Sequence, residues 1–168
     1  MILQKENPIL RNTARVIEMQ EIGGKYLTQV IENMQTELLS QEDGVAIAAP
    51  QIGESIRMFI ISRKVFNMTK KYAHLQGNDI ICINPVITKL SKEKKEMEEG
   101  CLSVRYLYGK VKRAYKASIE YTNEKGEKKT MSSSGLLAQI FQHEIDHLNG
   151  ILFIDTAKNI EEVLPQKK

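Results

Sequence analysis

The amino-acid sequence predicts an α+β fold, in which mainly antiparallel β-sheets pack around a central α-helix and a further helix lies near the N-terminus. Three observations predict this arrangement. An apolar stretch with helical periodicity covers residues 136–148, late in the chain. Residues 111–121 alternate with the period of two that is typical of a strand with two different faces. The strand-like runs do not alternate regularly with helices, which favours antiparallel sheets over a doubly wound fold.

The N-terminal helix is expected over residues 24–40. Its apolar residues recur at three-to-four-residue spacing, and a Glu-Asp-Gly sequence just beyond it breaks the pattern. The apolar stripe consists of Leu27, Val30, Ile31, Met34 and Leu38. Two short strands are expected next, at residues 56–61 and 80–83. Pro85 ends the second strand, and an extended segment begins again at residues 86–88.

The alternating segment 111–121 is expected to form one strand. The Asn-Glu-Lys-Gly sequence at residues 123–126 is typical of a hairpin turn and leads into a partner strand at residues 128–132. Near the C-terminus, residues 159–164 offer enough chain for two helical turns before Pro165.

The helix over residues 136–148 follows the hairpin. Gly135 precedes its apolar run and Asn149 with Gly150 ends it, as start and stop signals for a helix. Because the stretch is heavily apolar, we expect this helix to lie at the centre of the fold.

Length and composition indicate a single domain, residues 1–168, whose core needs no disulfide scaffold. The formal charge of +3 is mild, and lysines and glutamates are interspersed at residues 91–96, so we predict a solvated face there and no binding of DNA. The N-terminus has no signal-peptide pattern, and no apolar run approaches the length of a membrane span. Two cysteines suit a reducing compartment, and the expected location is the cytoplasm, with no membrane partner.

The predicted central helix carries the sequence His-Glu-Ile-Asp-His at residues 143–147. Positions i and i+4 share one face of a helix, about 6 Å apart along its axis, so His143 and His147 can hold one metal ion. The carboxylate of Glu144 projects beside that metal and can take a proton from an attacking water molecule. The pattern therefore indicates metal-assisted hydrolysis of a carbonyl compound. The alternative is a chance match on a surface helix, and the apolar context favours the metal site.

A tetrahedral catalytic metal site needs a third protein ligand. The third histidine of an extended protease motif would fall at Phe153, and the glutamates downstream leave little chain to fold back onto the metal. Cysteine remains. Cys101 follows Gly100, which permits close backbone approach, and Glu99, which can orient a neighbouring ligand. Cys82 lies between isoleucines and is expected to be a small core residue.

A third unusual segment is Gly-Val-Ala-Ile-Ala-Ala-Pro-Gln-Ile-Gly at residues 44–53. Its small residues make the backbone accessible, and Gln51 supplies an uncharged amide donor of the kind that holds a developing oxyanion. Alternatively, the segment is a tight connection between a strand and a loop, in which Gln51 only caps exposed backbone.

Together these segments resemble the peptide deformylase family. The carrying motifs are the small-residue segment ending at Gln51, EGCLS at residues 99–103 and QHEIDH at residues 142–147, and their order and separations fit over nearly the whole chain. The resemblance implies a metal-dependent hydrolase that removes the formyl group from the N-terminal formylmethionine of newly made bacterial or organellar proteins and releases formate.

By the same resemblance, Glu144 is the general acid/base, while the Gln51 side chain and the backbone N–H of Leu102 bind the formyl oxygen. The implied metal ligands are Cys101, His143 and His147. The implied cofactor is one divalent ion, usually Fe(II), although zinc, nickel or cobalt can occupy such a site.

The resemblance also implies a pocket for methionine. The expected substrate-binding residues are Val45, Ala46, Met97, Glu99, Gly100, Leu136, Gln139 and Ile140. Three features depart from the family pattern. Ala46 stands where a glycine is usual, Gln139 is an amide that must find a partner or face solvent, and residues 105–108 replace a segment that commonly begins with a Val-Pro or Ile-Pro pair.

Arg113 lies on the expected strand before the hairpin, and Asp146 lies within the predicted central helix, between the two histidines. An ion pair between them would clamp the helix to the sheet; the alternative is two separately solvated charges.

Two other functional classes stay open at the level of sequence. A zinc metallopeptidase shares the histidine pattern but leaves EGCLS unexplained, and a degenerate homologue would bind formylated chains without turnover. Some members of the family carry a longer C-terminal helix that docks on the ribosome. Transient ribosome association is therefore a further expectation from the resemblance.

Overall fold

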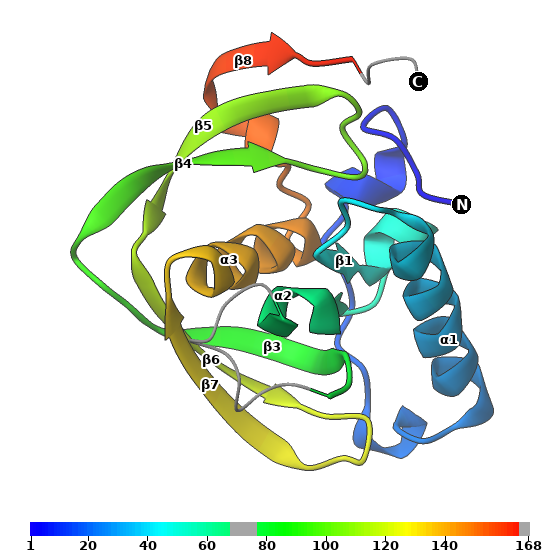
Figure 1. The fold of residues 1–168 in the computed structure, drawn as a ribbon. Helices are drawn as coiled ribbons and strands as arrows, with labels where there is room; N and C mark the ends of the chain where they lie inside the picture. The colour runs from blue at the N-terminus through cyan, green and yellow to red at the C-terminus, as the bar shows by residue number, and fades with distance from the viewer. Residues whose placement is uncertain (68–76, 165–168) are drawn as a thin grey trace.

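Two antiparallel sheets enclose one helix in the computed structural model, which describes residues 1–67 and 77–164 (Figure 1). The larger sheet has the order β1-β2-β3-β6-β7, and the smaller sheet has the order β4-β5-β8. The larger sheet consists of β1 (Ala46–Ala48), β2 (Met58–Ile61), β3 (Ile80–Leu90), β6 (Lys116–Thr122) and β7 (Lys128–Ser134). The smaller consists of β4 (Lys94–Gly100), β5 (Leu107–Ala114) and β8 (Lys158–Glu162). Every strand pair in these sheets is antiparallel, which confirms the predicted fold class.

The central helix is α3 (Leu136–Leu148), and it has the bounds that its apolar pattern predicts. Gly135 starts it at a φ of 65°, a conformation that glycine adopts without strain. The side-chain amide of Gln142 accepts from the backbone N–H of Ala114 and donates to the carbonyl of the same residue. This pair of bonds ties the middle of the helix to the end of β5. Buried residues of α3 pack with those of the larger sheet in one apolar core.

The predicted N-terminal helix is α1 (Lys25–Ser40), and its buried residues are Leu27, Val30, Met34 and Leu38. These pack with residues of β2 in a second apolar cluster. One short α-helix, α2 (Arg63–Asn67), follows β2. The other helical turns of the described residues are of the 3-10 type: η1 (Pro8–Arg11), η2 (Met19–Glu21), η3 (Ala49–Ile52) and η5 (Phe153–Asp155). No helix of the described residues is long and apolar enough to span a bilayer.

The sequence-based division at Pro85 was wrong, because β3 runs through it as one strand. The register with β6 shifts between Ile83 and Val86, and Asn84 there has a φ of 49°. Proline has no backbone N–H to donate to the hydrogen bonds between strands. A bulge at this position leaves Pro85 unpaired without ending the strand.

The prediction of one strand over residues 111–121 was also wrong. The chain forms β5 up to Ala114, breaks at Tyr115 and continues as β6, which belongs to the other sheet. The N–H of Tyr115 donates to the carbonyl of Glu93, and its carbonyl accepts from Gly135. Alternation of side chains continues on both sides of this bend, so periodicity alone does not reveal it. The hairpin from β6 into β7 is confirmed.

Two strands lie where the sequence did not indicate them. Strand β4 includes part of the charged run, and Lys94 to Glu96 are exposed, as expected of a solvated face. Strand β8 replaces the two helical turns expected over residues 159–164, and all five of its residues are exposed. It pairs with β5, so the hydrogen bonds of its backbone come from a neighbouring strand rather than from within a helix.

Candidate active site

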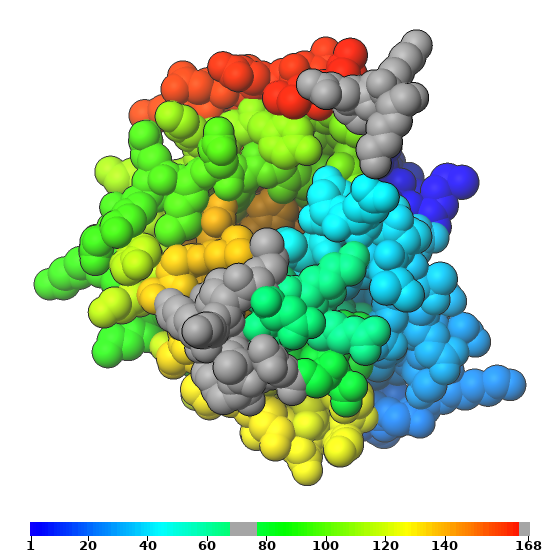
Figure 2. All heavy atoms as spheres, viewed as in Figure 1, coloured from blue at the N-terminus to red at the C-terminus, as the bar shows by residue number. Residues whose placement is uncertain are grey.

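A pocket of about 270 Å³ opens between β1 and β4, with α3 behind it. Both strands are end strands of their sheets, so the pocket lies between two sheet edges. In Figure 2, orange atoms of α3 are visible in a hollow between the green atoms of the smaller sheet and the cyan atoms around residue 50. The three sequence motifs meet here, since each supplies lining residues.

Three side chains that could hold a metal ion converge at this place. The ligand atoms of Cys101, His143 and His147 all lie within 4.8 Å of one another. Cys101 follows the last residue of β4, and its Sγ lies 3.2 Å from Nε2 of His147. The two imidazoles occupy adjacent turns of α3, with ring centroids 5.0 Å apart. Ligands of a tetrahedral ion are separated by roughly 3.5 Å, so one cation fits this set.

Glu99, on the smaller sheet, contacts a histidine of α3. Its carboxylate lies 2.8 Å from Nδ1 of His143 and accepts from Nε and Nη2 of Arg113 at 2.7 and 2.9 Å. Arg113 also donates to Asp146 at 2.6 Å, which confirms the ion pair as against two solvated charges. Burial alone would raise the pKa of Glu99, but the hydrogen bonds from Arg113 and His143 outweigh it and hold that pKa at about 2.

The pKa values of the two histidines shift in opposite directions. Burial opposes a charged imidazole at His143, yet hydrogen bonds with Cys101 and Glu99 outweigh it and raise its pKa well above the usual value. Burial lowers the pKa of His147 well below the usual value, which keeps this ring neutral and able to coordinate. The raised pKa favours a protonated ring at His143, so a metal that binds there must displace that proton, whereas the neutral ring of His147 is ready to coordinate.

Glu144 lies on α3 between the two histidines and is almost fully buried. Burial raises its pKa to about 7. Its Oε2 atom has no hydrogen-bond partner among the described residues. A buried carboxylate oxygen normally has a partner, so an unpaired one beside three convergent ligand atoms fits a site that binds a metal and water.

Gln51 is 2% exposed and lies in η3 beside the cysteine ligand. Its Oε1 accepts from the backbone N–H of Ala48 at 2.8 Å. Its Nε2 lies 3.1 Å from Oγ of Ser103 and 3.5 Å from Sγ of Cys101. One end of the amide thus bonds to backbone, as the alternative of a tight connection expects, and the other end faces Cys101 and Ser103.

Leu102 is buried at the start of a turn, in which the N–H of Val104 donates to the carbonyl of Cys101 at 3.0 Å. This bond fixes the plane of the peptide that carries the Leu102 N–H. The side chain of Gln4 donates to the Leu102 carbonyl and accepts from the N–H of Arg105. The cysteine loop is therefore held at both ends.

Of the expected substrate residues, all but one border the pocket: Val45, Ala46, Glu99, Gly100, Leu136, Gln139 and Ile140. Met97 is not among the lining residues; it is partly buried two positions before Glu99 on β4. The side-chain amide of Gln139 is hydrogen-bonded: its Nε2 lies 2.8 Å from the Glu98 carbonyl oxygen and 3.4 Å from Oε1 of Glu99.

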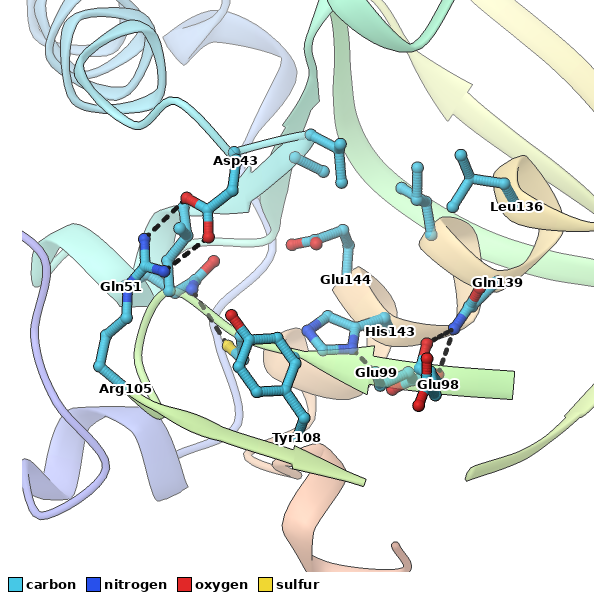
Figure 3. Close-up of a pocket in the computed structure, with 17 residues that line it drawn as sticks. Asp43, Gln51, Glu98, Glu99, Arg105, Tyr108, Leu136, Gln139, His143 and Glu144 are labelled. Carbon is cyan, nitrogen blue, oxygen red and sulfur yellow. Dashed lines mark hydrogen bonds and ion pairs between the residues drawn. The ribbon is translucent and has the colours of Figure 1, made fainter. Parts of the chain in front are cut away.

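The rim of the pocket contains residues to which the sequence assigned no role (Figure 3). Arg105 makes a bidentate ion pair with Asp43, at 2.6 and 2.9 Å, and so joins the two loops at the mouth. Tyr108 also lines the pocket, and its ring covers Gly100, where an added Cβ would come within 2.5 Å of it. The only sequence signal for these residues was the unusual segment 105–108.

Comparisons with known proteins point to one family. A family model described as polypeptide deformylase matches residues 1–163. The chain is 41% identical over 151 residues to peptide deformylase 2 of Clostridium acetobutylicum, covering 89% of each chain. It is 37% identical over 162 residues to a peptide deformylase of Fusobacterium nucleatum, covering 95% of this chain and 84% of that one. A Met-Ala-Ser-bound class I type b peptide deformylase from Acinetobacter baumannii has a TM-score of 0.81 and 33% identity, covering 93% of this chain and 96% of that one.

Proposed function

The chain belongs to the peptide deformylase family, and from this premise we propose a role for each group around the pocket. The protein is a metal-dependent hydrolase that removes the formyl group from the N-terminus of nascent proteins. The observation that carries the assignment of roles is the convergence of three ligand side chains, a buried glutamate and a buried amide on one cavity.

The metal is proposed to bind Cys101, His143 and His147, with Glu99 holding the ring of His143 in place. A thiolate and two imidazoles suit several divalent ions, and we propose Fe(II) as the ion in the cell, with zinc, nickel or cobalt able to replace it. A bound cation would supply Lewis-acid chemistry: it would polarise the formyl C=O bond and lower the pKa of a water molecule, so that hydroxide would be available near neutral pH.

Glu144 moves the protons. Its unpaired Oε2 takes a proton from the attacking water and later delivers one to the departing amine. A pKa near 7, raised by burial, suits a group that must both accept and donate. The side-chain N–H of Gln51 and the backbone N–H of Leu102 donate to the formyl oxygen as it gains negative charge.

The substrate is proposed to enter as an extended chain between β1 and β4, whose outer edges have backbone groups available for pairing. The methionine side chain packs against Val45, Leu136 and Ile140. Gln139 stays at the border of this pocket with its amide already bonded to β4, so its polarity does not oppose an apolar side chain.

The assay that tests the function measures formate release from formyl-Met-Ala-Ser by anaerobically prepared, iron-loaded protein, because a thiolate beside ferrous iron is sensitive to oxygen. We expect turnover by the parent protein, and loss of both metal and turnover in Cys101→Ser, since serine is a poor ligand for these ions. No formate from the parent would contradict the function. Metal content and activity retained in Cys101→Ser would contradict the ligand set alone.

Replacing Gln51 by leucine is expected to lower kcat by about 10²-fold with little change in KM, because its N–H bonds to an oxygen that is charged only in the transition state. Gln51→Glu keeps the acceptor for Ala48 but removes the donor, and should lose a similar factor. The matched control is Gln29→Leu, because Gln29 is an exposed glutamine on α1. Unchanged kcat in both Gln51 variants would remove this residue from the oxyanion site.

We further propose that residues 1–168 act as one catalytic domain in the cytoplasm, where formylated chains are made. Its bacterial relatives support this location. Any association with the ribosome is proposed to be transient; residues 158–162 form the exposed strand β8 and not a docking helix.

A further inference from the structure

The orientation of the Gln51 amide is fixed by the backbone. The N–H of Ala48 can only donate, and it lies 2.8 Å from Oε1 of Gln51. Oxygen must therefore face Ala48, and Nε2 must face the cysteine loop. Because the amide group is planar, only rotation about its last side-chain bond remains to decide where its two N–H groups point.

Ser103 removes this remaining freedom. Its Oγ lies 3.1 Å from Nε2 of Gln51, and its side chain is completely buried. The serine is itself held, since its backbone N–H lies 3.4 Å from Sγ of Cys101 and the next residue closes the turn back to the Cys101 carbonyl. A buried hydroxyl in a fixed turn is a rigid acceptor.

The geometry divides the two N–H groups of Gln51 between two tasks. With one N–H directed at Oγ of Ser103, the planar amide directs the other toward the side of the pocket where Cys101 lies, 3.5 Å away. That is the side on which the formyl oxygen must stand if Cys101 is a metal ligand. The donor is then oriented before the substrate arrives.

We infer that Ser103 is a positioning residue for deformylation: its hydroxyl accepts one N–H of Gln51 and so aims the other at the formyl oxygen. This inference rests on the proposed role of Gln51. Without the hydroxyl, the amide rotates and loses part of its orientation toward the oxygen. Because that interaction is made in the transition state, the loss falls on kcat rather than on KM.

The test is a double-mutant cycle with metal-loaded protein and formyl-Met-Ala-Ser. Ser103→Ala is expected to lower kcat by roughly tenfold, the equivalent of about one net hydrogen bond, with KM unchanged. In the Gln51→Leu background, the same substitution should change kcat by less than about twofold, because the group that Ser103 orients is gone. A residue that merely stabilised the fold would lower kcat by the same factor in both backgrounds.

Two controls keep the outcomes separate. Ser62→Ala removes another buried serine hydroxyl, outside the catalytic pocket, and should leave kcat unchanged. Visible absorption of the cobalt-loaded Ser103→Ala protein reports whether the thiolate of Cys101 still binds metal. An equal loss in both backgrounds, or no loss in the parent, overturns the inference while deformylation stands. If Gln51→Leu leaves kcat unchanged, the proposed role of Gln51 fails, and the inference fails with it.

Discussion

Replacing Glu144 by glutamine is expected to lower the kcat of formate release by about 10³-fold while the protein keeps its metal. Glutamine has nearly the same shape but cannot take a proton from water. The three proposed ligands are untouched by the change, and KM should stay within a few-fold of the parent value. The measurement combines formate release with metal content by elemental analysis on the same preparation.

The matched control is Glu120→Gln, an exposed glutamate on β6 away from the pocket. It should leave kcat unchanged. Glu144→Asp keeps a carboxylate but shortens its reach, so its activity should lie between those of the parent and Glu144→Gln. If Glu144→Gln kept more than about a tenth of the parent kcat, the proton acceptor would have to be another group.

Replacing Arg113 by methionine is expected to lower the free energy of unfolding by about 3 kcal/mol at pH 7. The side chain of Glu99 is only 2% exposed, so removal of the guanidinium would leave a buried carboxylate without its main partner. The orientation of His143 depends on the same carboxylate, and metal affinity should fall as well. Chemical denaturation and metal titration measure the two effects.

The direction of the pH effect follows from the pKa of Glu99, which is about 2 in the folded protein against an ordinary value of 4.5. A carboxylate whose pKa is lowered on folding contributes stability that is complete above its ordinary pKa and is lost as the pH falls toward 2. Measurement at pH 7 therefore records the full contribution, and the loss of stability in acid should be smaller in Arg113→Met.

The double variant Arg113→Met with Glu99→Gln removes both charges and should recover most of the lost stability. Asp146→Asn should cost less than Arg113→Met, because the Asp146 side chain is 27% exposed. Equal stability of the single and double variants would contradict the argument from an unpaired charge. An exchange of the charges of Arg113 and Asp146 is a poor test, since Arg113→Asp would set two carboxylates against each other at Glu99.

The three candidate metal ligands could be predicted because short-range features of the sequence single them out. Helical periodicity placed His143 and His147 on one face of α3, and the structure has the helix with the predicted bounds. The cysteine could be chosen because its glycine and acidic neighbours differ from the apolar neighbours of Cys82, which is fully buried in the core. Each of these inferences needed only a few adjacent residues.

What the sequence did not reveal depends on how distant segments meet. Asp43 and Arg105 are 62 positions apart, and no local pattern marks them as a pair. Tyr108 covers Gly100 because the register of β4 and β5 sets the two opposite each other. Strand β8 is similar: its residues have no apolar face, and only pairing with β5 makes the segment extended. The secondary-structure propensities of single residues do not determine how distant strands pair.

The position of the pocket between two sheet edges sets a limit on when the enzyme can act. The edges of β1 and β4, between which the substrate is proposed to bind, can pair only with a chain in the extended conformation. A protein whose first residues have already entered a helix, or have packed into a core, presents no such strand. Removal of the formyl group therefore competes with folding of the substrate, and chains grow at about 5–20 residues per second. Slowly folding N-termini give this enzyme more time than fast helical ones.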